Sequence, residues 1–223
     1  MSDQESQPIA DPEELRLFPL NVILFPGGLF PLRIFEERYK LMIGECLKGN
    51  LPFGVVLIKE GPEVGGLASP HKVGTTARIT KAERLEEGRY TLQTVGEKRF
   101  RIQEITRETP YLMAKVEYLE DEGLEELGEL PKRAGEVLAE YWKTLAGVKG
   151  GWVRSVDTPK DPLALSYAVA RSVAHPPVVG QYLLQMSSVK ERLERALPLL
   201  DERLTLAREE LEKRTPFQGP RLN

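Results

Sequence analysis

The hydrophobic pattern of this 223-residue chain changes once, within an acidic stretch at residues 120–129. Before that stretch, apolar residues alternate with polar ones and glycine or proline interrupts the chain often, which is typical of β-strands. After it, apolar residues recur every three or four positions, which is typical of helices that bury one face. These two periods predict an α+β protein in which a β-rich part precedes a helical part.

The β-rich part is expected to contain one helix. Residues 53–58 form a continuous apolar run and residues 73–79 alternate, so both predict strands. A hairpin turn is expected at residues 86–89 and a second turn at Gly96-Glu97, after which a new strand begins. Residues 36–48 place apolar side chains at helical spacing, and a glycine follows as a stop signal. We therefore expect a sheet that is interrupted by this one helix.

The helical part begins after the acidic stretch. Asp161 and Pro162 form an N-cap and a first helical position, and residues 163–174 are apolar on all sides. Such a helix must be covered by neighbours, so we expect a large apolar interface between the helical part and the β-rich part. The acidic stretch that joins the two parts is expected to be exposed and open to proteases. The predicted division is a flexible acidic leader (residues 1–13), a β-rich subdomain (14–120), a helical-bundle subdomain (121–214) and a tail (215–223).

Charge and composition argue against several classes of partner. The chain has 31 basic and 34 acidic residues, so it lacks the excess of cations that binds a phosphate backbone. Cys46 is the single cysteine and lies on the apolar face of the expected helix, which predicts a buried thiol. The acidic N-terminus does not resemble a signal peptide, and no apolar run approaches the ~18–20 residues needed to cross a bilayer. We expect a cytoplasmic protein that binds no membrane and for which nucleic acid is a poor partner.

No set of residues predicts catalysis, a metal or a cofactor. Ser187 and Lys190 have the Ser-x-x-Lys spacing of some hydrolases, but the companion motifs of those enzymes do not occur in the sequence. Residues 188–191 fit a helix-capping box better. His71 and His175 are the only histidines and lie too far apart in sequence for a zinc motif. A hydrolase would need a nucleophile, a base and an orienting group, and no such set can be named.

The N-terminal segment carries a family resemblance. Residues 17–28 read Leu-Phe-Pro-Leu-Asn-Val-Ile-Leu-Phe-Pro-Gly-Gly, and residues 29–39 continue Leu-Phe-Pro-Leu-Arg-Ile-Phe-Glu-Glu-Arg-Tyr. This segment resembles the opening of the substrate-binding N-terminal domain of Lon proteases, and further matches follow in register at residues 53–57, 73–79 and 98–102. The resemblance covers about residues 15–205. It implies a PUA-like β pseudobarrel with one inserted helix, followed by a C-terminal α-helical bundle.

The resemblance also implies a function without chemistry. Lon proteases continue into an ATPase module and a Ser-Lys peptidase domain, whereas this sequence ends at Asn223 without a Walker lysine loop or a peptidase serine motif. Proteolysis and ATP hydrolysis are therefore not expected. The expected role is recognition of unfolded or damaged polypeptide in protein quality control, as an adaptor or holdase that works with a separate protease or chaperone.

The expected peptide site is an apolar groove near residues 26–39 and the loop at residues 63–66. Exposed aromatic and aliphatic side chains there would bind extended chains with little demand on sequence. The alternative is that the aromatic residues close the core of the β-rich part. The candidate peptide-binding residues are Phe25, Pro26, Leu29, Phe30, Arg33, Tyr39, Glu63, Val64 and Gly65.

RNA binding is the alternative function, because PUA-like domains also occur in RNA-modifying proteins. Its candidate footprint is basic: Arg78, Arg84, Lys98, Arg99 and Arg101. Phe100 among them would be a stacking aromatic. However, Glu97 and Glu104 dilute the positive charge, so an ordinary solvated strand face is the favoured interpretation of residues 98–101.

Overall fold

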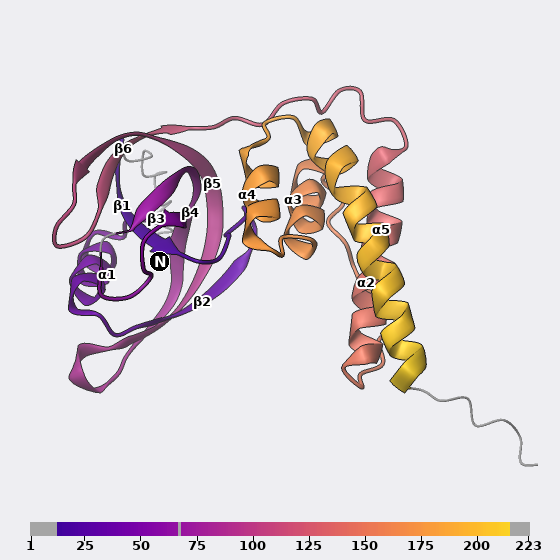
Figure 1. Cartoon of the computed structure of the whole chain (residues 1–223), viewed down its shortest axis with the longest axis horizontal. Coiled ribbons are helices and arrows are strands. Elements are labelled where there is room, and N and C mark those ends of the chain that lie inside the picture. The colour runs from indigo at the N-terminus through magenta and orange to yellow at the C-terminus, as the bar shows by residue number, and fades with distance from the viewer. Residues whose placement is uncertain (1–12, 67, 215–223) are drawn as a thin grey trace, which may run out of the picture.

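The strands and the helices occupy opposite sides of the molecule in the computed structural model, which describes residues 13–66 and 68–214 (Figure 1). The predicted leader, apart from Glu13, and the predicted tail lie outside the described residues. The β-rich side consists of β1 (Glu14–Leu20), β2 (Leu29–Ile34), α1 (Glu37–Gly49), β3 (Phe53–Glu60), β4 (Ser69–Arg84), the 3₁₀ turn η1 (Glu86–Gly88), β5 (Tyr90–Arg107) and β6 (Met113–Tyr118).

The six strands form one sheet that closes on itself. Its strand order is β2-β5-β4-β3-β1-β6, and the additional pairing of β5 with β6 completes the ring. β1 and β3 are parallel, and the other pairs are antiparallel. β2 lies outside this ring, because it pairs only with residues 90–95 of β5. Within the described residues, one edge of β2 is therefore not paired with any strand. The finer expectation of a PUA-like pseudobarrel stays a prediction.

β5 is one continuous strand, so the second turn predicted at Gly96-Glu97 is wrong. The register between β4 and β5 shifts there by one residue, which is a β-bulge. The loop between β1 and β2 crosses at this point: Gly27 donates its N–H to the Gly96 carbonyl, and the Gly96 N–H bonds the Gly28 carbonyl. A Cβ at Gly96 would lie 2.3 Å from the Phe25 carbonyl oxygen. This glycine therefore permits a close backbone approach and does not make a turn.

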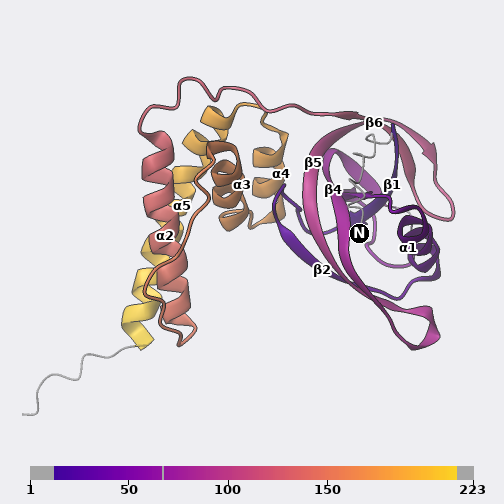
Figure 2. The same cartoon turned by 180° about the vertical axis from the view of Figure 1, so that it is seen from behind.

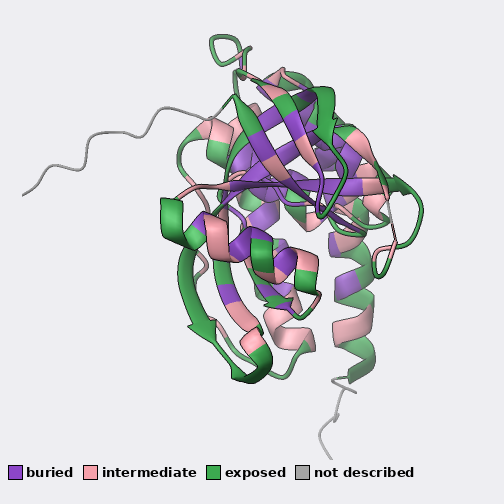
Figure 3. Ribbon diagram, turned by 90° about the vertical axis from the view of Figure 1, so that its left-hand side faces the viewer, coloured by how far each residue is buried: buried purple, intermediate pink, exposed green. Residues whose placement is uncertain are grey.

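α1 confirms the predicted helix within the sheet. It buries Tyr39, Met42, Ile43 and Cys46 on one face, and Asn50 ends it in the left-handed conformation with φ of 50°. The buried face contacts a cluster of strand residues that includes Phe18, Phe53 and Leu92. Figure 3 shows that the strands carry buried segments on the inside of the sheet and that α1 has both buried and exposed residues.

Four helices follow the acidic stretch. They are α2 (Leu130–Val148), α3 (Pro162–Ser172), α4 (Pro177–Gln185) and α5 (Val189–Arg214), and α3 begins at Pro162 as the sequence predicts. Asp161 caps α3 by accepting from the Ala164 N–H at 2.8 Å, and the Ser188 hydroxyl accepts from the Glu191 N–H at 3.2 Å. Ser188 thus acts as a helix cap, as expected. α2 and α5 lie side by side, and α3 and α4 separate them from the sheet (Figures 1 and 2).

The sheet and the helices share a core. Residues 165–170 of α3 are all buried, as an all-apolar helix requires. Phe25 and Val73, from the β-rich side, belong to the same buried cluster as the helices. Gln181 of α4 donates to the Val73 carbonyl at 3.0 Å, and the Phe25 and Tyr167 rings lie 6.4 Å apart. These contacts form the predicted interface, while the division into two subdomains near residue 120 stays a prediction.

A fragment of residues 1–120 is expected to be less stable than the whole chain. Removing the helices would expose Phe25 and Val73 and would deprive the Arg99 side chain of its Asp121 and Leu184 acceptors. Thermal unfolding followed by circular dichroism should show aggregation or a clearly lower melting temperature for the fragment. A soluble monomeric fragment that melts with the full chain would contradict the shared core.

Candidate functional site

The loop at residues 63–66 is fastened to the segment that leads from β2 into α1. The Glu36 carboxylate pairs with Arg38 at 2.9 Å and accepts from the Gly65 N–H at 3.2 Å. Arg38 also donates to the Gly66 carbonyl at 2.6 Å. The Glu63 carboxylate accepts from the side chain of Asn21 at 2.6 Å and from its main-chain N–H at 3.2 Å. The structure therefore brings the two regions of the predicted site together.

Next to this loop, β2 presents exposed side chains in an alternating row. Leu29, Pro31, Arg33 and Phe35 are exposed, with 82% exposure for Leu29 and 55% for Phe35. Alternate residues of a strand share one face, so Leu29, Pro31 and Arg33 lie together. Phe35 follows directly after β2, and we call these four residues the β2 surface. Val64, which is 56% exposed, belongs to the loop whose Gly65 N–H bonds to Glu36, the residue after Phe35. Large apolar side chains that are this exposed are typical of binding surfaces when they cluster.

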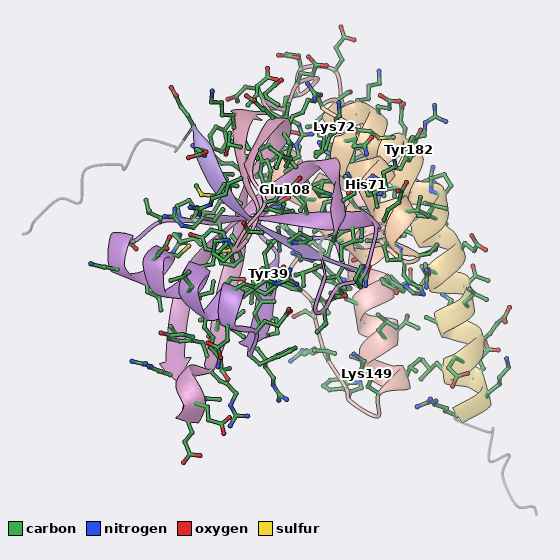
Figure 4. The ribbon with its side chains drawn as sticks, turned by 60° about the vertical axis from the view of Figure 1, so that its left-hand side comes forward. Tyr39, His71, Lys72, Glu108, Lys149 and Tyr182 are labelled. Atoms are coloured by element: carbon green, nitrogen blue, oxygen red, sulfur yellow. The ribbon has the colours of Figure 1, made fainter. Side chains whose placement is uncertain are left out.

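Three of the predicted aromatic residues face inward. Phe25 is fully buried against the helices, and Tyr39 is buried where α1 meets the strands, with its ring 4.2 Å from the ring of Phe18 (Figure 4). Phe30 is partly buried and lies against the same cluster as Tyr39. The expectation that Phe25 and Tyr39 contact a peptide directly is therefore corrected: both rings close the core, which was the alternative interpretation.

A groove runs between the sheet and α3. Its volume is about 590 Å³, and we call it the α3 groove. One wall is a single face of α3, since Asp161, Ala164, Ala168 and Arg171 recur every three or four residues. The opposite wall is built from the β1–β2 loop, β5 and the chain that follows β6, namely Pro26, Gly27, Glu97, Lys98, Arg99, Tyr118, Leu119, Glu120 and Asp121. Pro26 is the predicted site residue that lines it.

A buried ionic cluster holds the walls of this groove together. Arg99 of β5 and Arg192 of α5 both contact the same Asp121 oxygen, at 2.9 and 2.5 Å, and both are almost wholly buried. The other Asp121 oxygen accepts from the Tyr167 hydroxyl. Burial raises the pKa of the Tyr167 phenol, so this hydroxyl stays protonated and donates. One carboxylate therefore connects β5, α3 and α5.

This cluster corrects two predictions from the sequence. Arg99 was expected on a solvated strand face but is 1% exposed, because Asp121 and the carbonyls of Leu184 and Glu120 accept its hydrogen bonds. The acidic connection was expected to be exposed throughout, but Asp121 anchors its start. The signal that could have been used is Arg192, a charged residue within the apolar stripe of the last helix.

The basic residues of the RNA alternative are dispersed. Arg99 is buried, Arg78 pairs with Glu97, and Arg101 lies 3.8 Å from Glu117. These five cations therefore do not make a continuous exposed row. A second cleft of about 620 Å³ is more basic, since Lys59, His71, Lys72 and Arg101 line it beside Gln185 of α4. Figure 4 shows His71 and Lys72 on this side of the sheet, near Tyr182 of α4. Burial and the nearby Lys59 lower the pKa of His71.

Titratable groups elsewhere are structural. Glu45 accepts from Arg16 at 3.0 Å and from the Tyr111 hydroxyl at 2.5 Å, and these bonds lower the pKa of Glu45. Burial raises the pKa of Cys46 to about 11. In residues 13–66 and 68–214, no three histidine, cysteine or acidic side chains gather where they could hold a metal ion. Over the same residues, no helix is long and apolar enough to span a membrane.

Comparison with known proteins agrees with this architecture. Lon protease 2 of Myxococcus xanthus is 32% identical over 201 residues, which are 86% of this chain and 24% of that protein. The crystal structure of a Lon N-terminal domain protein from Xanthomonas campestris has 27% sequence identity and a TM-score of 0.62, and the match covers 83% of this chain and 97% of that one. The N-terminal domain of the Mycobacterium avium complex Lon protease, at 18% identity and a TM-score of 0.61, shares the fold over 85% of this chain and 98% of that one.

The fold thus defines a protein with the architecture of Lon N-terminal domains. The model of the ATP-dependent protease La (LON) substrate-binding domain matches residues 14–202, and the chain belongs to this family. It spans 24% and 23% of the lengths of the two Lon proteases from Myxococcus xanthus and Anaeromyxobacter dehalogenans. The family is described as the substrate-binding domain of these proteases, and that domain is the part to which residues 14–202 correspond.

Replacing Asp121 with alanine should destabilise the protein strongly. The Asp121→Ala variant would leave two buried guanidinium groups without their carboxylate, and breaking a buried pair from one side costs about 3–5 kcal/mol. Chemical denaturation measures this loss. Glu125→Ala, an exposed residue in the same acidic stretch, is the matched control and should stay within about 0.5 kcal/mol of the wild type. Equal stabilities of the two variants would show that the cluster is unimportant.

The thiol of Cys46 should be unreactive in the folded protein. It is 1% exposed and its pKa is about 11, so both access and thiolate formation are suppressed at neutral pH. An aromatic disulfide reagent should modify it slowly in buffer and rapidly in denaturant, as followed by absorbance. Equal rates in the two solutions would mean that α1 does not stay docked on the sheet.

Proposed function

We propose that this chain is a polypeptide-recognition module without a catalytic role, which binds unfolded or damaged protein segments. The observation that carries the proposal is the match of residues 14–202 to the Lon substrate-binding domain. In the cell, the proposed module would deliver or hold its clients for a separate protease or chaperone in the cytoplasm.

The β2 surface supports this proposal as a place where polypeptide binds. β2 offers unpaired main-chain groups along one edge, and an extended segment can add to such an edge by hydrogen bonds that do not depend on its sequence. Pro31 within β2 fits an edge strand, because proline has no N–H to donate to a neighbouring strand. Main-chain pairing would give affinity for any extended chain, which is the requirement for binding varied unfolded clients.

The exposed side chains would add an apolar contact to this pairing. Leu29 and Phe35 stand at the two ends of the β2 surface, and Val64 lies beyond Phe35 on the anchored loop. A client segment that alternates apolar and polar residues could place its apolar side chains over them. Because Glu36, Arg38 and Asn21 already hold the loop, little conformational entropy of the loop would be lost when a client binds.

The test is the binding of an unfolded protein with blocked thiols, measured by fluorescence anisotropy. Leu29→Asp should weaken binding by about tenfold or more, since it places a charge on the most exposed apolar side chain of the β2 surface. The matched control is Leu206→Asp, which changes an exposed leucine of α5, 54% exposed, outside the β2 surface. Both variants should melt with the wild type.

The same titration at low and high salt separates this function from RNA binding. Apolar and main-chain contacts should hold their affinity as salt rises, whereas phosphate contacts weaken steeply. Wild-type binding that Leu29→Asp leaves unchanged would reject the β2 surface, and no binding of unfolded protein by the wild type would reject the proposed function itself.

A further inference from the structure

The α3 groove carries a cation that has no acidic partner among the described residues. Arg171, in the last turn of α3, lines the groove, and its guanidinium reaches the β1–β2 loop: a Cβ placed on Gly28 would lie 3.4 Å from Arg171 Nη1. No carboxylate of the described residues makes an ion pair with it. Arg171 is exposed at the surface, yet the protein atoms packed around its side chain lower its pKa, and no acidic group offsets this desolvation. The groove therefore presents a partly desolvated positive charge at one end.

Three of the four acidic side chains that line the groove are engaged elsewhere. Glu97 pairs with Arg78, and Asp121 pairs with the two buried arginines. Asp161 caps the first turn of α3, ten residues before Arg171, which corresponds to about 15 Å along a helix. Glu120 is exposed, and its main-chain carbonyl accepts a hydrogen bond from Arg99. Lys98, the remaining cation of the lining, lies 6.0 Å from the Tyr118 ring centroid.

Between its acidic and basic ends, the groove is lined by apolar and small residues. Leu163, Ala164 and Ala168 come from α3, with Pro26 and Leu119 opposite them. The volume of about 590 Å³ lies in the ~300–1,000 Å³ range of pockets that bind small ligands. At ~3.3 Å per residue, a length of about 15 Å holds four or five residues of an extended chain. The shape thus suits a short extended peptide segment with small or medium apolar side chains.

We propose that the α3 groove binds the C-terminal end of a polypeptide, with Arg171 receiving the free α-carboxylate and the apolar lining receiving the last side chains. A guanidinium binds a carboxylate through two parallel hydrogen bonds, which are stronger than neutral ones. Arg171 lies at one end of the α3 wall and complements a single anion at one end of an apolar segment, and a C-terminus is such an anion. The preceding residues would leave the groove at the Asp161 end.

This inference rests on the proposed function in that the ligand is polypeptide, but it uses a different surface. The β2 surface would bind the middle of an extended chain, whereas the α3 groove would bind the end of one. The β1–β2 loop connects the two, since Pro26 lines the groove and β2 begins at Leu29. One client could therefore contact both surfaces.

Three fluorescently labelled octapeptides with the same apolar C-terminal residues test the proposal on the full chain. The first ends in a free carboxylate, the second in an amide, and the third in an amide with one internal glutamate. Anisotropy should show that the carboxylate peptide binds at least tenfold more tightly than the other two. A peptide with an internal glutamate that binds as well as the first would overturn the assignment to a chain terminus.

Variants of the groove test the two parts of the recognition. Arg171→Gln should remove the preference for the carboxylate and leave amide binding unchanged, whereas Arg195→Gln, an exposed arginine of α5 outside the groove, should keep the preference. Ala164→Phe, at an exposed position of the lining, should weaken binding of both peptides by filling the groove. Melting curves check that each variant is folded.

The outcomes separate this inference from the proposed function. Equal binding of acid and amide peptides by the wild type, or a preference that persists in Arg171→Gln, would overturn the role of the groove. The unfolded protein is titrated on the same preparations. If the wild type binds it but does not distinguish the peptides, the inference fails and the proposed function stands. If it binds neither, both fail.

Discussion

The carboxylate of Asp121 is the contact on which the arrangement of the molecule depends. Two guanidinium groups share it, one from the sheet and one from the last helix, and this leaves an excess of positive charge in a buried place. That excess is tolerated because the main-chain carbonyls of Leu184, Met186 and Glu120 accept further hydrogen bonds, although Arg99 Nε has no acceptor among the described residues. Since Tyr167 bonds the same carboxylate, α3 is held in place as a wall. The α3 groove therefore exists only when strand, connection and helices are docked together.

Local rules predicted the parts of this fold that depend on neighbouring residues. The change of hydrophobic period, the helix within the sheet and the Asp161 cap of α3 could all be read from short windows. The bulge at Gly96 could not, because its cause is the backbone of a loop about seventy residues earlier in the chain, and a glycine reads equally well as a turn. The burial of Arg99 could not be predicted for the same reason: its partners are distant in sequence, and Asp121 is one of several acidic residues in that stretch.

The candidate site was predicted as a region better than as a set of side chains. The family resemblance indicated the segment around residues 25–39 and the loop beyond it, and the structure joins the two through Glu36 and Arg38. It could not tell which aromatic residues close the core, because a buried and an exposed phenylalanine look alike in sequence. Arg171 was not singled out, since a cation near the end of a helix is common for reasons of the helix dipole. Only the three-dimensional arrangement shows that no acidic residue in the described part of the chain pairs with it.

The position of Pro31 bears on whether copies of this chain can pair with one another through β2. An open strand edge beside exposed leucine and phenylalanine is a template on which identical molecules can stack into fibrils. A proline in the middle of that edge interrupts any long intermolecular ladder, because it removes a donor that each stacked copy would need. Short, transient pairing with another chain needs fewer bonds and survives the interruption. The same residue would thus permit reversible contacts and discourage polymerisation.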